Sequence, residues 1–245
     1  MTSSHTTGAS ARQELTPILK WVGGKRQLLD FIRPLIPEHT TYCEPFVGGG
    51  AVFFDLQPKK AVINDFNQEL INVYQTVKEQ PEELIELLLR HREQNSQEYF
   101  YQIRALDREP EKYEELTPAQ RAARIIYLNK TCYNGLFRVN SAGQFNAPWG
   151  RYKNPNIVPE DNIRAMSRYL NNPLRRLQGS LEGAEKGSLC LPGSTLHASQ
   201  LFLLLHRVYG VWVWTGRADR AEETVRSAEQ KGHKVSALQF LLRFY

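Results

Sequence analysis

Apolar and polar residues alternate along the first half of the chain in a pattern that predicts a βαβ unit. Apolar stretches at residues 41–46 and 61–63 have the length of strands, and each ends at a polar or glycine-rich turn. Between them, residues 51–56 (AVFFDL) predict a helix, and residues 27–36 have the spacing of a short amphipathic helix that Pro37 closes. Strands that alternate with helices predict an α/β fold with a doubly wound parallel sheet.

The pattern then becomes helical and later rich in loops. Residues 67–106 are rich in Glu, Leu and Gln with a helical period, and residues 118–129 predict a second strong helix. Over residues 130–159 the composition changes to Asn, Gly, Tyr, Phe, Arg and Pro, with turn signals at Asn134-Gly135 and Ala142-Gly143. We interpret this stretch as an inserted lobe that contains a hairpin.

Composition limits the class of protein. A chain of 245 residues with 41% hydrophobic content can bury a large core, which excludes a disordered or fibrous protein. The net charge of +5 permits a polyanionic partner without requiring one. Cys43, Cys132 and Cys190 form no CxxC pair, so we expect reduced thiols and no metal site. The first fourteen residues lack an export signal. The apolar run at residues 201–214 is too short to span a membrane. We therefore expect a cytoplasmic protein.

The first chemical motif is the glycine run in EPFVGGGAVFF, residues 44–54. Glycines directly after a strand let the backbone turn sharply and approach a ligand at the carboxyl edge of the sheet. Asp65 ends the following strand, where such folds place a carboxylate that binds ribose hydroxyls. The alternative is a tight turn between strand and helix with an exposed Asp, and this motif taken alone favours that alternative.

A second motif, KWVGGK at residues 20–25, precedes the first predicted helix. Its Trp and lysines have the chemistry to hold an adenosine ring and a carboxylate, but taken alone the motif favours a surface loop with a buried Trp. KWVGGK, EPFVGGGAVF and NDFN, in this order, resemble the opening of the Dam-type, or D12 class, DNA N6-adenine methyltransferases, and the resemblance covers residues 17–171.

That resemblance implies S-adenosyl-L-methionine as the cofactor. It also implies a Rossmann-like methyltransferase sheet with an inserted helical and hairpin lobe that recognises DNA. The residues at cofactor-binding positions of the family are Trp21, Lys25, Glu44, Phe46, Gly48, Gly50 and Asp65.

The third motif, residues 129–155, interleaves Lys and Arg with Tyr, Phe and Trp. Cations that neutralise phosphate beside rings that stack or wedge between bases are typical of a nucleic-acid surface. A small aromatic core with solvated charges is the alternative. The string resembles the target-recognition hairpin of the Dam-type enzymes, which implies double-stranded DNA as partner and GATC as the first prediction for the site. The predicted DNA contacts are Lys130, Tyr133, Asn134, Leu136, Arg138, Pro148 and Arg151.

With this resemblance, the pattern divides the chain into four parts. Residues 1–14 predict a disordered tail, and residues 15–66 the cofactor-binding part of the methyltransferase domain. Residues 67–160 predict the helical and hairpin target-recognition lobe, and residues 161–245 the catalytic half with an atypical sequence. We expect a monomer. A role in a restriction-modification system and a solitary role are both open.

The catalytic tetrapeptide of the family is missing from its expected place. In the family, the Asp side chain and a proline carbonyl of DPPY accept the hydrogens of the adenine N6, and the Tyr ring stacks on the flipped base. This chain has SLCLPGSTLHASQLFLLL at residues 188–205 and contains neither DPPY nor NPPY, so its catalytic residues are unassigned.

The residues in that place are compatible with a shifted reading frame. Codons exist for residues 190–200 that, read one nucleotide later, give VYLDPPYMPVS. We therefore expect a frame slip between residues 171 and 188, with impaired turnover of this chain. A catalytically inactive remnant that binds cofactor and DNA is the alternative. RNA methylation is disfavoured because the hairpin resembles that of the DNA enzymes.

Overall fold

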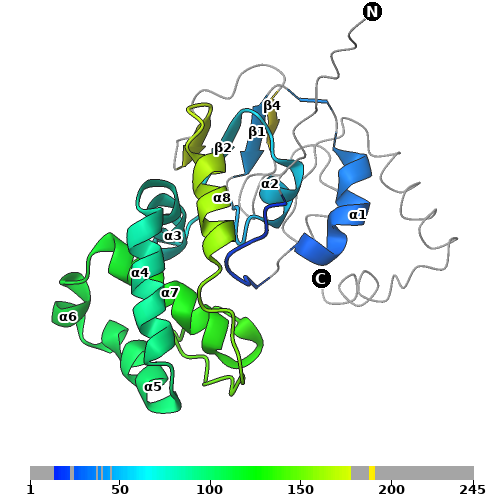
Figure 1. The fold of residues 1–245 in the computed structure, drawn as a ribbon. Coiled ribbons are helices and arrows are strands. Elements are labelled where there is room, and N and C mark those ends of the chain that lie inside the picture. Colours follow the sequence, from blue (N-terminus) through cyan, green and yellow to red (C-terminus); the bar gives the residue numbers. More distant parts are fainter. Residues whose placement is uncertain are drawn as a thin grey trace, which may run out of the picture.

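The part of the chain that the structure describes is mostly helical, with one small parallel sheet. The computed structural model describes residues 14–22, 25–36, 38–39, 41–44, 46–177 and 188–190. Within them the architecture is mixed α/β, with the sheet at one end and most helices in a lobe at the other (Figure 1). The predicted tail and most of the predicted catalytic half lie outside the described residues.

Four short strands form the sheet. They are β1 (Thr41–Glu44), β2 (Ala61–Ile63), β3 (Arg175–Leu177) and β4 (Ser188–Cys190). Their order is β3-β2-β1-β4, and each neighbouring pair is parallel. All four residues of β1 are buried, as expected for an inner strand of a parallel sheet. The two strands predicted from the sequence, at residues 41–46 and 61–63, are thus confirmed as β1 and β2, with β1 two residues shorter.

The helix between these strands, α2 (Ala51–Leu56), has the predicted bounds. The helix predicted over residues 27–36 is only partly correct. Its place is taken by three short helical turns: η1 (Lys25–Leu28), α1 (Leu29–Ile32) and η2 (Arg33–Leu35). Pro34 explains the break before η2, because proline has no N–H for an intrahelical hydrogen bond and lies in the first turn of η2.

The helical lobe confirms the helices predicted over residues 67–106 and 118–129. It contains α3 (Gln68–Glu79), α4 (Pro81–Glu93), α5 (Gln97–Ala105), η3 (Leu106–Arg108), α6 (Pro110–Glu114) and α7 (Pro118–Thr131). Thr117 and Gln120 form a capping box at the start of α7. Residues on all sides of α7 are buried, so this helix is the centre of the lobe.

The last described helix, α8 (Glu160–Leu170), packs on α3 and α4 and leads back to β3. Aromatic side chains join α2 to α8 and α3: Phe53 lies 5.3 Å from Tyr169, and Phe54 lies 6.1 Å from Tyr74, between ring centroids. The buried apolar residues form one continuous core through both ends of the protein. Among the described residues, no helix has the length and apolar character needed to cross a membrane.

The predicted hairpin is present between α7 and α8. It starts with the helical turn η4 (Tyr133–Gly135), and isolated antiparallel bridges pair Cys132 with Trp149 and Val139 with Phe145. Asn140 closes the tip, because its side-chain oxygen accepts hydrogen bonds from the backbone of Ala142 and Gln144.

Candidate functional site

The glycine loop lies at the carboxyl edge of the sheet. Because β1 and β2 are parallel, with Glu44 opposite Ile63, the residues that follow both strands meet at this edge. Asp65 accepts hydrogen bonds from the backbone N–H of Gly48 at 2.9 Å and of Asn67 at 3.0 Å. The structure therefore brings together the predicted glycine loop and the predicted carboxylate, and Asp65 holds the loop in place.

Two of the glycines have backbone conformations that strain any residue with a side chain. Gly48 and Gly50 have positive φ angles of 52° and 73°. A Cβ on Gly50 would lie 2.7 Å from the Phe54 ring and 2.9 Å from the Tyr74 hydroxyl. That hydroxyl donates a hydrogen bond to the carbonyl of Gly48 at 2.7 Å. The loop is thus held from the sheet side by Asp65 and from α3 by Tyr74.

A buried ion pair ties the KWVGGK segment to β1. The Lys25 ammonium contacts one oxygen of Glu44 at 2.9 Å, and the Tyr42 hydroxyl donates to the other at 2.6 Å. Glu44 is 1% exposed, so its charge requires such partners. Burial, and then the Glu44 charge, raise the pKa of Tyr42, which stays a protonated donor. Phe46, just beyond the strand, is half-buried.

Trp21 lies between the glycine loop and the hairpin. Its ring stacks on Phe137 with 4.5 Å between centroids and 17° between planes. On the loop side, a Cβ on Gly48 would lie 3.2 Å from the Trp21 ring. The first and third sequence motifs therefore meet through one indole ring.

Asn129, near the end of α7, connects the second motif, KWVGGK, to the third. Its side chain accepts a hydrogen bond from the Lys20 N–H at 2.9 Å and donates to the carbonyls of Lys20 at 2.9 Å and Gly135 at 2.8 Å. The residue is 2% exposed. Three hydrogen bonds from one buried amide fix the start of the KWVGGK segment against the turn η4.

The hairpin presents apolar and cationic side chains to solvent. Tyr133 is 60% exposed and Leu136 is 40% exposed, although apolar side chains of this size are usually buried. Arg138 is exposed as well, and its guanidinium donates to the side chain of Asn146 at 2.8 Å and to its carbonyl at 3.2 Å. The Arg138 side chain is thereby oriented while its surface stays open to a partner.

The other predicted contact residues differ in exposure. Asn134 and Arg151 are exposed and have positive φ angles of 59° and 55°, and Pro148 is exposed beside them. The Pro148 carbonyl accepts a hydrogen bond from the Tyr133 N–H. Lys130 is only half-buried, and burial together with the charge of Lys20 lowers its pKa.

Phe66 is a candidate that the sequence reasoning missed. It follows Asp65 directly and is 88% exposed, the largest exposed fraction among the described large apolar residues. Its signal was present in the sequence, because Phe is the one apolar residue of the turn NDFN, where solvent-facing polar residues are expected. Asn129 was also missed; its signal was a polar residue within an apolar helix.

Comparison with known proteins agrees with these motifs. Residues 21–184 match the model of the D12 class N6 adenine-specific DNA methyltransferases. Over 174 residues the chain is 52% identical to the type II methyltransferase M1.LlaDCHI of Lactococcus lactis subsp. cremoris, covering 70% of this chain and 61% of the relative. It is 42% identical over 176 residues to the type II methyltransferase M.MjaIII of Methanocaldococcus jannaschii, covering 65% and 60%.

The DNA adenine methylase of Salmonella typhi is 34% identical over 197 residues, covering 77% of this chain and 68% of the relative. The chain spans about three fifths of the length of the relatives from Lactococcus lactis subsp. cremoris and Methanocaldococcus jannaschii. The family match covers more than half of the chain, including the glycine loop, the helical lobe and the hairpin. The chain therefore belongs to the D12 class of N6 adenine-specific DNA methyltransferases.

Proposed function

We propose that the chain binds S-adenosyl-L-methionine at the glycine loop and duplex DNA at the hairpin, as a site-specific methyltransferase for adenine N6. The observation that carries this proposal is the position of Trp21, which contacts the glycine loop and Phe137 of the hairpin at once. Methyl transfer requires such adjacency, because a flipped base must meet the methyl donor within contact distance. The family and the relatives' names support the same reaction.

The sheet fits this cofactor. Its strand order 3-2-1-4 equals the first four strands of the doubly wound nucleotide-binding fold, whose ligands bind at the carboxyl edge. One oxygen of Asp65 accepts from the loop at Gly48 and the other from Asn67, but a carboxylate has about four lone-pair sites, so Asp65 can also accept ribose hydroxyls. The exposed Phe66 ring offers an apolar face to the adenine.

The methionine end of the cofactor fits the other side of the loop. Lys25 has three N–H donors and pairs with Glu44 through one, so it has donors for a cofactor carboxylate. Trp21, Phe46, Gly48 and Gly50 would wrap this end, with Glu44 holding Lys25 in position. When bound, the cofactor supplies an electrophilic methyl group; the protein supplies its orientation.

The hairpin fits duplex DNA. The exposed Tyr133 and Leu136 have the form of wedges that insert between bases when one is flipped out. Arg138, oriented by Asn146, is suited to the acceptor edge of guanine, and Asn134 to an adenine. Lys130, Pro148 and Arg151 would contact the backbone beside them. GATC is our first proposal for the target.

Turnover of this chain should be impaired. β4 ends at Cys190, beside Cys43 of β1, and the family tetrapeptide is expected after this strand. The sequence there is LPGS, and the family match ends at residue 184. We infer a slipped reading frame between residues 171 and 188. Sequencing the gene tests this inference, and codons that give no DPPY in any frame would reject it.

Two assays test the function of the protein itself. Calorimetry with S-adenosyl-L-methionine should show binding, and transfer of labelled methyl groups to a GATC duplex should be far below that of an intact relative. Incorporation at the relative's rate would refute the impairment, and no heat would refute the cofactor site. Cofactor binding and duplex binding without any methyl transfer would identify the second candidate, an inactive remnant. The missing tetrapeptide favours this candidate. We further propose a cytoplasmic monomer, as expected for a DNA-modifying enzyme of this size.

A further inference from the structure

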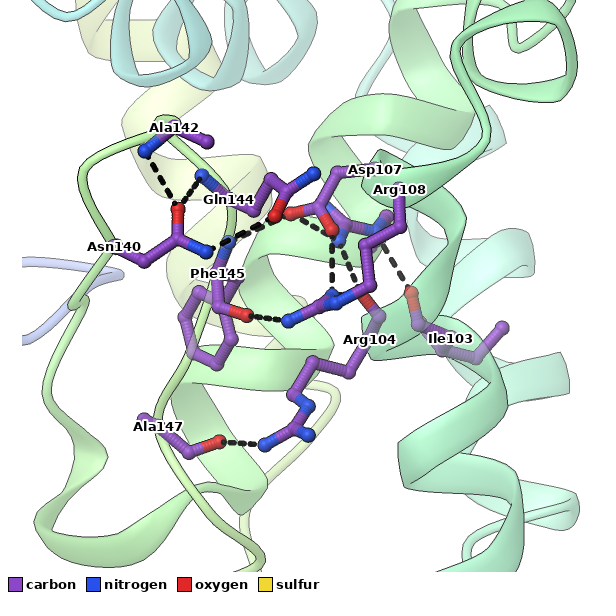
Figure 2. Close-up of polar contacts among 10 residues, drawn as sticks. Ile103, Arg104, Asp107, Arg108, Asn140, Ala142, Gln144, Phe145 and Ala147 are labelled. Atoms are coloured by element: carbon purple, nitrogen blue, oxygen red, sulfur yellow. Dashed lines mark hydrogen bonds and ion pairs between the residues drawn. The ribbon is translucent and has the colours of Figure 1, made fainter.

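We propose that Asp107 positions the recognition hairpin for reading DNA, by holding the hairpin backbone without contacting DNA itself. The proposal rests on the proposed function of the hairpin. Asp107 lies in η3, at the end of α5, and is remote in sequence from the hairpin. Figure 2 shows the two segments side by side, joined by polar contacts.

Asp107 and its neighbour Arg108 bind both backbone polar groups of one hairpin residue, Phe145. The Phe145 N–H donates to Asp107 Oδ2 at 2.7 Å, and Arg108 Nη2 donates to the Phe145 carbonyl at 2.9 Å (Figure 2). Arg108 also contacts Asp107 Oδ1 at 2.8 Å. Two side chains thus satisfy the donor and the acceptor that a neighbouring strand would pair in a sheet.

The clamp has a rigid base in the helical lobe. Arg124 of α7 is 2% exposed and pairs with Asp107 Oδ2 at 2.9 Å. The same guanidinium donates to the carbonyls of Ile103 and Arg104 at the end of α5. A buried cation needs its carboxylate partner, so Arg124 and Asp107 keep each other in place.

A third contact holds the same arm of the hairpin. Arg104 Nη1 donates to the carbonyl of Ala147 at 3.2 Å, two residues beyond Phe145 (Figure 2). Both arginine donors come from the end of α5 and from η3, so both carbonyl contacts lie on the side of the hairpin that faces this segment.

The hairpin depends on such support. In the described part of the chain it has isolated bridges rather than a continuous ladder, and a lone two-stranded hairpin is marginal in water. Asn146, between the two gripped residues, orients Arg138. A shift of Phe145 would therefore move Asn146, and with it Arg138, the side chain proposed to read guanine.

The test compares Asp107→Ala and Asp107→Asn with a control of matched stability. Asp107→Ala removes every acceptor, whereas Asp107→Asn keeps the shape and one acceptor but loses the charge that holds Arg124. The control is Ile85→Val or Ile85→Ala, whichever matches the urea midpoint of the Asp107 variants; Ile85 is buried in α4.

Hydrogen exchange of the free protein is the first measurement. We expect faster exchange of residues 138–150 in both Asp107 variants, more in Asp107→Ala, with the control like wild type in this segment. Fluorescence anisotropy then gives the ratio of Kd values for a permuted duplex and a GATC duplex. The loss of a well-placed arginine contact should lower this ratio by a factor of about 5 to 140, since such a contact discriminates by about 1–3 kcal/mol. The control should keep the ratio.

The outcomes separate the clamp from the proposed function. Unchanged exchange of the hairpin in Asp107→Ala overturns the clamp. A loosened hairpin with an unchanged ratio, or a control that loses the ratio equally, overturns the positioning role. A wild-type protein that does not distinguish the duplexes refutes the GATC proposal instead, while the exchange measurement still decides whether Asp107 holds the hairpin.

Discussion

Replacing Asn129 with leucine removes the junction between the KWVGGK segment and the turn η4 at almost constant volume. Three hydrogen bonds are lost: those to the Lys20 N–H, the Lys20 carbonyl and the Gly135 carbonyl. Gly135 is buried, so its carbonyl becomes an unsatisfied acceptor. Lys20 is exposed, and water can replace the lost partners of its backbone.

The expected cost follows from this difference in burial. An unsatisfied buried group costs about 1–3 kcal/mol, and a hydrogen bond that water replaces about 0.5–1.5 kcal/mol. With partial compensation by the new apolar side chain, Asn129→Leu should lower the free energy of unfolding by roughly 2–4 kcal/mol. The cofactor affinity should fall too, because Trp21 follows the released Lys20.

Urea unfolding and calorimetry with S-adenosyl-L-methionine measure these effects. Asn171→Leu is the matched control: Asn171 also donates to two carbonyls, those of Lys78 and Ser167, but it is exposed. Its loss should stay below about 1 kcal/mol. If Asn129→Leu costs no more than Asn171→Leu, the amide does not hold the junction and the reasoning fails.

Three further perturbations test other parts of the structure. Gly50→Ala should lower the free energy of unfolding by about 2–4 kcal/mol, because φ is positive at this position and the added Cβ would collide with the Phe54 ring. Calorimetry should then detect no cofactor binding, and binding at the wild-type level would contradict the loop geometry. Phe66→Ala should weaken cofactor binding about five- to tenfold in calorimetry without moving the urea midpoint, since the ring is exposed; a destabilised variant would show that Phe66 packs on the core. Burial lowers the pKa of His91 to about 4 from 6.5, so the unfolded chain binds a proton first as the pH falls. Stability should therefore decline by up to about 3 kcal/mol between pH 6.5 and 4, and a His91→Phe variant with the same decline would refute this cause.

Local chemistry decided which elements the sequence predicted well. The bounds of α2 and β2 were correct because a glycine run and the pair Asn64-Asp65 interrupt the apolar pattern sharply. The helix predicted at residues 27–36 is broken before η2, where Pro34 lies in the first turn. The prediction gave more weight to the amphipathic period of this segment than to the proline.

Contacts between distant segments were beyond such reasoning. The resemblance placed Trp21 and Arg138 at two binding surfaces, and the structure shows how Phe137 and Asn146 hold them. Asp107 carries no sequence signal at all, because its role depends on the packing of α5 against α7 and the hairpin. A pattern of polarity reports which face is buried, but it does not report which partner lies across the interface.

We expect binding and turnover to be separable in this chain, because the proposed binding surfaces and the expected catalytic motif lie in different segments. The contacts that shape the two proposed binding surfaces, such as Trp21 with Phe137 and Asp65 with Gly48, join residues that all precede β3. The chemistry of the family instead requires groups that follow β4, where this sequence departs from the motif. β4 still pairs with β1, so the sheet edge continues up to that point. Loss of the later motif should therefore reduce methyl transfer much more than cofactor or DNA affinity, and a parallel loss of all three would show that the binding surfaces need the last third to fold.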